Sequence, residues 1–313
     1  MKNDAQAKAQ VQVGICIITL QRPEGLRALL TGLANLTFAK VAAPDIRIAV
    51  VDNDAQGSAR SVVEAAPSEL NIIYQIEPRK GIPIARNRTV NILKDQVDFC
   101  VFIDDDEVPP SEWLDELLMV QARYDAAVVA GPVRTTFTET PQAWLLEGDF
   151  FAPAEHATGD KLEHCATNNT LVRAELFDEY QFDERFALTG GEDTQLFMRI
   201  KAAGHDLIWA ADAYVTETMP SSRANMRWLL KRSYREGNSY ALAEFSLDAS
   251  PKKKLERFLK GFTRLTQGAL GAAVSFWKKP QFVQHVRRAY LGAGMISGTL
   301  GSRYEEYKEI HGA

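Results

Sequence analysis

Apolar runs alternate with segments of helical spacing along the first 133 residues of the chain. Five apolar runs of strand length lie at 11–20, 45–54, 71–77, 97–104 and 126–133. Four segments with helical spacing separate them, at 23–36, 57–66, 82–95 and 111–124. Pro23 suits the first turn of a helix, and Ser111 is the expected cap of the last of these helices. The alternation predicts βαβ units, an α/β fold with a mostly parallel sheet sandwiched by helices.

The pattern loosens after residue 133. Residues 137–165 show no clear periodicity and are expected to form a long functional loop. Residues 165–177 read as a strand turning into a short helix, 192–204 as a helix, and 207–217 as one or two short strands. From residue 223 onwards the spacing is mostly helical. We therefore predict an α/β region at 11–220 and a helical region at 221–313.

Composition narrows the class of protein. The chain has 313 residues, and no run of 18 apolar residues predicts a spanning helix. The opening segment MKNDAQAKAQ lacks the apolar core of an export signal. Cys16, Cys100 and Cys165 are odd in number and far apart, which favours buried, reduced thiols in a cytoplasmic protein over disulfides or a zinc site.

Charge is distributed unevenly along the chain. Residues 251–313 carry 12 Lys and Arg against 4 Asp and Glu, whereas the whole chain has a net charge of −5. Segment 252–279 combines Phe, Leu and Trp with lysines at both ends, so its partner could be an anionic membrane surface. A helix packed on the α/β region, with solvated lysines, explains the segment equally well. No feature points to nucleic acid as a partner.

The stretch VFIDDDEVPP places three carboxylates directly after a buried strand. Ligands of open α/β sheets bind at the carboxyl ends of the strands, where Thr19 to Arg22 and Asp52 to Asp54 are also expected. Asp104, Asp105 and Asp106 would repel one another unless a divalent cation neutralised them, and oxygen ligands suit Mg²⁺ or Mn²⁺. The alternative is a solvated acidic turn before the next helix.

Five segments in order resemble the family 2 glycosyltransferases, which have the GT-A fold. They are ICIITLQRP, IAVVDND, GIPIARNR, VFIDDDEVPPSEWL and TGGEDTQLFMRI. The resemblance spans about residues 12–235, and RSYREG is similar to the R-x-Y-x-x-G of bacterial exopolysaccharide-type members. It implies that residues 11–220 are a nucleotide-sugar-binding and catalytic GT-A domain, followed by a helical, basic region.

The resemblance implies a metal site. Asp104 and Asp106 are the expected ligands of Mn²⁺ or Mg²⁺, with Asp106 the direct one. Many relatives place a histidine after the E-D helix, but AYVTETMP has Glu217 there, and none of the five histidines lies in this stretch. Either Glu217 takes the metal role or the aspartates act alone.

The same resemblance implies contacts to the nucleotide-sugar donor. Asp52 would accept a hydrogen bond from a uracil-type base, and Asp105 would contact ribose or metal-bound water. Arg86 would lie along the base or the diphosphate, and Thr19 and Arg22 are further donor-binding candidates. Ordinary roles in turns and surface ion pairs are the alternatives for these residues.

A carboxylate near the metal but not bound to it suits a general base that deprotonates the acceptor hydroxyl. In GGED, the resemblance makes Asp193 the base and Glu192 a neighbour that orients base or acceptor. The alternative is simple capping of the helix by acidic residues in its first turn. One carboxylate base without a second, nucleophilic carboxylate fits a single displacement, which inverts the anomeric centre.

Three residues are candidates for the acceptor side. Asn168 and Asn169 match a polar pair that family members place beside the donor or acceptor sugar, and Trp144 could stack on a sugar face. The alternatives are an Asn turn and core packing.

The predicted function is therefore an inverting, metal-dependent transfer of one sugar from a nucleotide sugar, with UDP-sugar as the expected donor. The acceptor would be a glycan or a lipid-linked sugar in polysaccharide biosynthesis, at the inner face of the membrane. Processive synthases carry Q-x-x-R-W, but NMRW at 225–228 lacks the Gln. A non-catalytic nucleotide-sugar-binding or scaffolding protein of the same fold is the alternative. A dehalogenase-like phosphatase is disfavoured because the first strand ends in ITLQRP.

Overall fold

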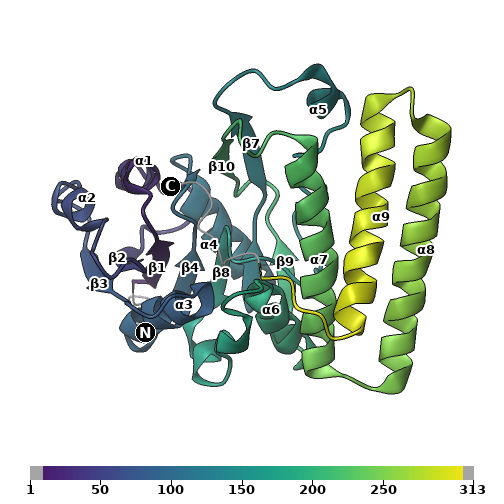
Figure 1. Cartoon of the computed structure of the whole chain (residues 1–313). Helices are drawn as coiled ribbons and strands as arrows, with labels where there is room; N and C mark the ends of the chain where they lie inside the picture. The colour runs from purple at the N-terminus through teal and green to yellow at the C-terminus, as the bar shows by residue number, and fades with distance from the viewer. Residues whose placement is uncertain (1–9, 306–313) are drawn as a thin grey trace.

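The computed structural model describes residues 10–305, and its centre is a seven-stranded sheet with the order β3-β2-β1-β4-β8-β6-β9 (Figure 1). Its strands in chain order are β1 (Gln12–Thr19), β2 (Asp45–Asp52), β3 (Ile72–Ile76), β4 (Phe99–Phe102), β6 (Val128–Ala130), β8 (Thr170–Arg173) and β9 (Leu207–Trp209). Every neighbouring pair is parallel except those that β8 makes with β4 and β6. This confirms the predicted α/β fold with a mostly parallel sheet.

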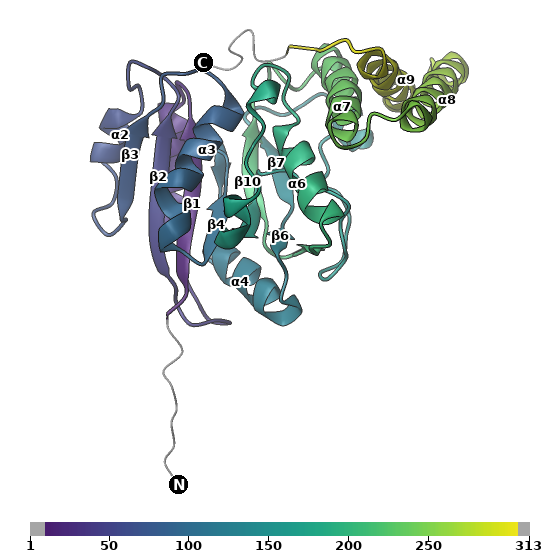
Figure 2. The ribbon, with the colours of Figure 1, turned by 90° about the horizontal axis from the view of Figure 1, so that it is seen from below.

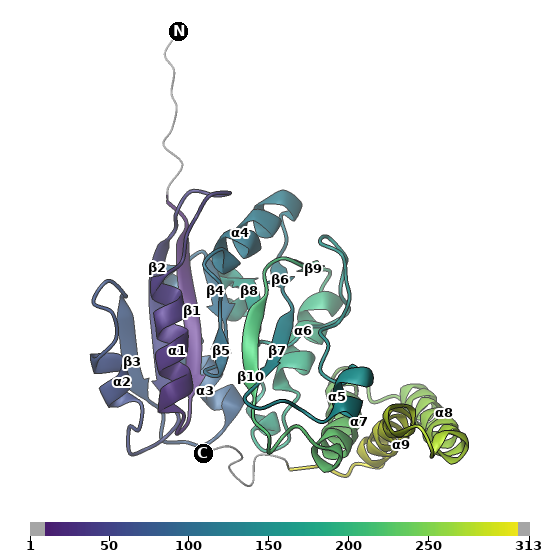
Figure 3. The ribbon, with the colours of Figure 1, turned by 90° about the horizontal axis from the view of Figure 1, so that it is seen from above.

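Helices cover both faces of this sheet (Figures 2 and 3). One face is covered by α1 (Pro23–Ala34), α2 (Arg60–Glu64) and α4 (Trp113–Tyr124), and the other by α3 (Ile82–Leu93) and α6 (Glu192–Ala202). α1 shows why the sequence folds in this way. Pro23 begins it, and Leu26, Leu29, Leu30 and Leu33 recur at helical spacing and are buried against the sheet.

The apolar run 126–133 is broken where the sequence predicted one strand. It contributes β6 to the large sheet and then β7 (Val133–Phe137) to a second, three-stranded sheet with the order β5-β10-β7. Pro132 has no N–H for a ladder, and a Cβ on Gly131 would lie 2.1 Å from the Ala213 carbonyl oxygen. The other strands of the small sheet are β5 (Glu107–Val108) and β10 (Val215–Met219).

Two local expectations differ from the structure. Ser111 does not cap α4, because that helix begins two residues later and its N-cap residue, Glu112, makes no side-chain capping bond. The Ser111 carbonyl instead accepts a hydrogen bond from the Thr37 N–H at 2.8 Å. The irregular segment 137–165 contains one short helix, α5 (Ala143–Glu147). Further 3₁₀ turns lie at Lys94–Gln96, Ala174–Asp178 and Glu184–Phe186.

Three long helices follow the sheets: α7 (Met226–Leu247), α8 (Pro251–Ser275) and α9 (Lys279–Thr299). α9 packs between α7 and α8 (Figure 1). Across residues 10–305, none of the helices is both long enough and apolar enough to cross a membrane. Most of the opening segment, in which no export signal was expected, and the last eight residues of the predicted helical region lie outside the described residues.

Candidate active site

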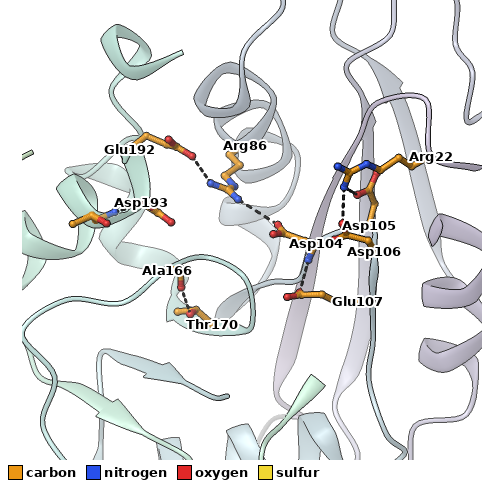
Figure 4. Close-up of polar contacts among 11 residues, drawn as sticks. Arg22, Arg86, Asp104, Asp105, Asp106, Glu107, Ala166, Thr170, Glu192 and Asp193 are labelled. Carbon is orange, nitrogen blue, oxygen red and sulfur yellow. Dashed lines mark hydrogen bonds and ion pairs between the residues drawn. The ribbon is translucent and has the colours of Figure 1, made fainter. Parts of the chain in front are cut away.

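Three predicted segments come together beyond the carboxyl ends of β1 and β4 (Figure 4). Thr19 ends β1, and Arg22 follows it. The three aspartates follow β4, and Glu192 and Asp193 form the first turn of α6. Because parallel strands end at the same edge of a sheet, residues far apart in sequence meet here.

Asp105 is held by residues that were predicted to contact the donor. Thr19 Oγ1 donates a hydrogen bond to Asp105 Oδ2 at 2.7 Å, and Arg22 Nη1 lies 3.1 Å from Oδ1. The same Nη1 lies 2.8 Å from Asp106 Oδ2. Burial raises the pKa of Asp105 to about 6, although Arg22 favours the charged form. Thr19 and Arg22 thus fix the acidic loop in this conformation.

Arg86 joins the two acidic segments. Its Nη1 donates to Glu192 Oε1 at 2.5 Å, and its Nη2 donates to Asp104 Oδ1 at 3.3 Å (Figure 4). Only 7% of Arg86 is exposed. A buried guanidinium between two carboxylates fixes their relative positions, because its planar fork allows little rotation. Arg86 therefore belongs to the site, and its contact with the donor stays a prediction.

Glu192 is buried in the first turn of α6. Burial raises its pKa to about 7, against the opposing effect of Arg86 and with a further rise caused by Asp193. Within residues 10–305, no group hydrogen-bonds to its Oε2 atom. At neutral pH this carboxyl group is thus poised between its charged and neutral forms.

Asp193 lies opposite Asp104 across the site (Figure 4). Burial raises the pKa of Asp104, and the charges of Asp106 and Asp193 add to that rise. The two acidic segments therefore interact electrostatically. The chain turns sharply before α6 through Gly190 and Gly191, whose φ angles of 70° and 89° suit glycine. Asp193 is half-buried, and its Oδ1 accepts the Thr194 N–H at 2.6 Å.

Asp106 and Glu217 lie on either side of Arg223. Arg223 Nη1 lies 3.9 Å from Asp106 Oδ2 and 3.7 Å from Glu217 Oε1. Burial, followed by the charge of Asp106, raises the pKa of Glu217. Burial also raises the pKa of Glu107 well above its usual value, and its carboxylate accepts the Asp104 N–H at 2.9 Å. The predicted metal ligands therefore lie in one acidic neighbourhood.

The donor set fits a hard divalent cation, since it consists of carboxylate oxygens that disfavour one another's charge. Arg22 and Arg223 supply compensating positive charge beside Asp106 in this conformation. In the part of the chain that the structure describes, no three His, Cys, Asp or Glu side chains converge closely enough to hold a metal ion. The ligand set Asp104, Asp106 and Glu217 accordingly stays a prediction.

The predicted contact between Asp52 and a base does not fit this conformation. Asp52 is fully buried. Its Oδ1 accepts the Asp54 N–H at 3.0 Å, and its Oδ2 accepts the Ala59 N–H at 2.7 Å and the Tyr74 hydroxyl at 2.9 Å. Asp52 thus holds the loop between β2 and α2 from within, and any effect on a donor is indirect.

Asn169 is a structural residue and does not face an acceptor. It is fully buried at a φ of 87°. Its Oδ1 accepts the Trp113 Nε1–H at 2.7 Å, and its Nδ2 donates to the Pro132 and Ala213 carbonyls at 3.1 and 2.6 Å. This amide therefore ties the two sheets together. Asn168 is half-buried beside it and stays a candidate.

Trp144 is also a packing residue, with 8% of it exposed. It meets Phe150 edge-on at 5.5 Å and packs in a small core with Leu229 and Val283. Its Nε1 donates to Gln142 Oε1 at 2.6 Å. Trp144 therefore cannot stack on a sugar as predicted, because Phe150 and side chains of α7 and α9 cover its ring.

Three residues of the site escaped sequence reasoning. Arg223 lies between the carboxylates of Asp106 and Glu217. Glu107 is buried and accepts the Asp104 N–H. His164 is half-buried and interacts electrostatically with Asp193. Burial lowers the pKa of His164, and its ring meets Tyr240 at 5.3 Å. Glu107 adjoins the aspartate run and was within reach of prediction. Arg223 and His164 carry no local pattern that would single them out.

Comparisons with known sequences agree with this geometry. Residues 14–181 match the sequence description of Glycosyl transferase family 2. The chain is 33% identical to a Rhizobium meliloti (strain 1021) protein described as "Succinoglycan biosynthesis protein ExoM", over 95% of each chain.

Solved structures share the fold at low identity. A mannosyltransferase from Pyrobaculum calidifontis, in complex with GDP-Man and Mn²⁺, superposes with a TM-score of 0.64 at 16% identity, covering 92% of this chain and 87% of that one. S. aureus TarS 1–349, in complex with UDP-GlcNAc, superposes with a TM-score of 0.54 at 14% identity, covering 94% and 93%. These likenesses concern the fold alone.

Proposed function

The chain belongs to glycosyl transferase family 2 and is a glycosyltransferase, and from that premise we propose that it transfers one sugar, with inversion, from a nucleotide sugar to a glycan or lipid-linked acceptor. The Rhizobium meliloti relative is described as a succinoglycan biosynthesis protein, which supports a role in making an exopolysaccharide. The proposal extends to metal dependence, with Mn²⁺ or Mg²⁺ as cofactor.

One observation carries this proposal: Arg86 binds Asp104 on one side and Glu192 on the other. The donor-side carboxylates and the base-side carboxylates are thereby held in a fixed relation. Transfer needs the sugar between a stabilised leaving group and a base, in near-attack geometry. Asp193 lies next to Glu192, opposite Asp104, where an acceptor hydroxyl would have to approach (Figure 4).

In the proposed mechanism, Asp193 accepts the proton of the acceptor hydroxyl as that oxygen attacks the anomeric carbon. Asp193 is half-buried and is not one of the predicted metal ligands, so it can reach an acceptor. Glu192, held by Arg86, is a positioning residue for this first turn of α6. The reaction forms one bond to the attacking oxygen and breaks the bond to the diphosphate, which inverts the anomeric centre.

On the donor side, Asp104 and Asp106, with Glu217 as a third candidate, would hold the divalent cation. A bound cation would stabilise the negative charge that develops on the diphosphate leaving group. Arg22 and Arg223 contact Asp106 in this conformation and are available to balance charge there. Asp105, fixed by Thr19, would orient the ribose.

The donor is proposed to be a UDP-sugar, and the comparisons support a nucleotide sugar more broadly. The TarS structure contains UDP-GlcNAc, whereas the Pyrobaculum enzyme contains GDP-Man with Mn²⁺. Single loop contacts worth about 1–3 kcal/mol decide between such donors.

A thermal-shift screen tests the donor and the metal together, since a ligand that binds the folded state raises the melting temperature. UDP- and GDP-sugars are compared with and without Mn²⁺. The proposal predicts a shift that needs both a UDP-sugar and the metal. A metal-independent shift, or one produced only by GDP-sugars, would contradict the corresponding part of the proposal.

A further inference from the structure

α8 turns an apolar face toward the outside of the molecule. Its outer face consists of side chains that are each more than half exposed: Leu255, Leu259, Phe262, Leu270, Val274 and, just past the helix end, Trp277. Steps of three, four and eight residues place these side chains on one side of a helix. Large contiguous apolar patches on a protein surface mark an interaction site.

The inner face of α8 shows that this orientation is built into the sequence. Gly261 and Gly268 lie against α9, where a Cβ on Gly268 would be 2.4 Å from the Ala289 nitrogen. A Cβ on Gly261 would be 3.0 Å from the Gly292 carbonyl oxygen. Such close backbone approach fixes which side of α8 faces inward. The outer face is therefore left without a partner within the described residues.

Positive charge lies at both ends of the outer face. Residues 251–299 contain ten Lys and Arg, and Glu256 is their single acidic residue. Lys252, Lys253 and Lys254 lie at the start of α8, and Lys278 and Lys279 lie just past its end. An apolar stripe between two basic clusters is the pattern of a helix that lies in an anionic interface.

The helix is also in the right place to meet a flat surface. α8 is the outermost element of the hairpin that it forms with α9, beyond the sheet on the side of the strands' carboxyl ends (Figures 2 and 3). The candidate active site lies at those carboxyl ends. The outer face of α8 points away from α9 and from the sheet, so a surface could meet it without contacting the α/β region (Figures 2 and 3).

We propose that the outer face of α8 docks on an anionic lipid bilayer, with the helix lying along the interface and its lysines on the headgroups. A second copy of the chain is disfavoured as the occupant. Pairing two α8 helices in either direction would place one basic cluster against another, and like charges in contact are repulsive. This inference does not depend on which donor or acceptor the enzyme uses.

Vesicle co-sedimentation of the full chain tests the proposal. The protein is mixed with phosphatidylcholine vesicles, with or without phosphatidylglycerol, at increasing salt. We expect binding only to the anionic vesicles, and less of it as salt rises. The variant Leu259→Gln/Phe262→Gln/Leu270→Gln should lose about tenfold or more in vesicle affinity, because bound apolar area sets the strength of such docking.

The matched control is Leu146→Gln on α5, since Leu146 is 56% exposed and Leu259 is 53% exposed. The control should bind vesicles like wild type. All variants should have the melting temperature of wild type, because Gln is a good helix former at exposed positions. Wild type that ignores anionic vesicles at low salt would overturn the proposal, as would outer-face variants that still bind. So would a stable dimer that the same three substitutions dissociate, which would assign the face to a second copy.

Discussion

Arg86 on α3 and Glu192 on α6 form a buried ion pair, with Nη1 2.5 Å from Oε1. The two residues are 106 positions apart in sequence. The same guanidinium reaches Asp104 at 3.3 Å. This pair therefore determines how far the acidic loop after β4 stands from the first turn of α6, which is the distance that a transfer reaction must control.

Arg86→Met should damage both stability and catalysis. It leaves buried Glu192 without its cation, and breaking a buried pair from one side costs about 3–5 kcal/mol. Turnover should fall at least about a hundredfold, because a small misplacement of reacting groups is sufficient for such a loss. Urea unfolding and product release measure the two effects.

The control for this prediction is Arg88→Met, two positions along α3. Arg88 is exposed, and the hydrogen bond that it donates to Gln75 is exposed to solvent. This variant should unfold and turn over like wild type, within about 0.5 kcal/mol of its stability. If the two variants behaved alike, the proposed linking role of Arg86 would be wrong.

Asp106→Asn tests the metal site. A neutral amide cannot replace a carboxylate ligand, so metal-dependent transfer should fall about a thousandfold, which corresponds to about 4 kcal/mol of lost transition-state stabilisation. The fold should persist, since the ion pair with Arg22 is partly exposed. Asp45→Asn, at the amino end of β2, is the control and should stay active. Full activity of Asp106→Asn, or of wild type in excess chelator, would rule out the assignment.

Stability should depend on pH through Glu192. Its pKa is about 7 in the folded protein, above its usual value of 4.5. The folded state then binds more protons than the unfolded state between these values, so stability should fall as pH rises from about 4.5 to about 7. The loss should be on the order of 3 kcal/mol for a shift of this size. The charged groups that affect Glu192 are Arg86, Asp193 and Arg235.

Urea unfolding at pH 5 to 8 measures this dependence. Glu192→Gln removes this titrating group and should make the fall shallower over that window, and the fall that remains should come from groups such as Asp105, whose pKa burial also raises. The control Glu163→Gln changes an exposed carboxylate and should keep the wild-type curve. Parallel curves for wild type and Glu192→Gln would show that another group is responsible.

The sequence predicted the features that local patterns determine. Alternating apolar runs and helical spacing predicted the α/β sheet. Their position after a strand singled out Asp104 to Asp106, because parallel strands bring their carboxyl ends to one edge. Glu192 and Asp193 in the first turn of α6 were singled out only by the resemblance to the family. Pairing between distant segments was beyond reach. Residues 170–173 read as a strand, but no pattern indicates that they enter the sheet antiparallel between β4 and β6.

The failures at single residues have the same origin. An Asn in a turn and an Asn that ties two sheets together look alike in sequence, and only the Pro132 and Ala213 carbonyls reveal the role of Asn169. Nothing in the sequence indicates that Leu229 on α7 and Val283 on α9 cover Trp144. Asp52 was predicted from its place after a strand, but Tyr74 and the α2 backbone occupy its oxygens.

Asn169→Ala separates the structural role from the predicted acceptor role. It removes three buried hydrogen bonds and leaves the Trp113 Nε1–H and the Ala213 carbonyl without these partners, while the Pro132 carbonyl keeps the Val215 N–H. The free energy of unfolding should fall by about 3 kcal/mol or more. Asn168→Ala changes the half-buried neighbour and should cost less than about 0.5 kcal/mol. Equal stabilities in thermal unfolding would contradict the structural assignment of Asn169.

The most direct test of the account is Asp193→Asn, measured for both donor binding and turnover. If Asp193 is the base, calorimetry with the nucleotide diphosphate and Mn²⁺ should give the wild-type affinity, because the base contacts the acceptor and not the donor. Sugar transfer should fall at least about a hundredfold, the usual contribution of a positioned base. Donor binding that disappears together with turnover, or turnover that survives the substitution, would contradict the claim that Asp193 activates the acceptor.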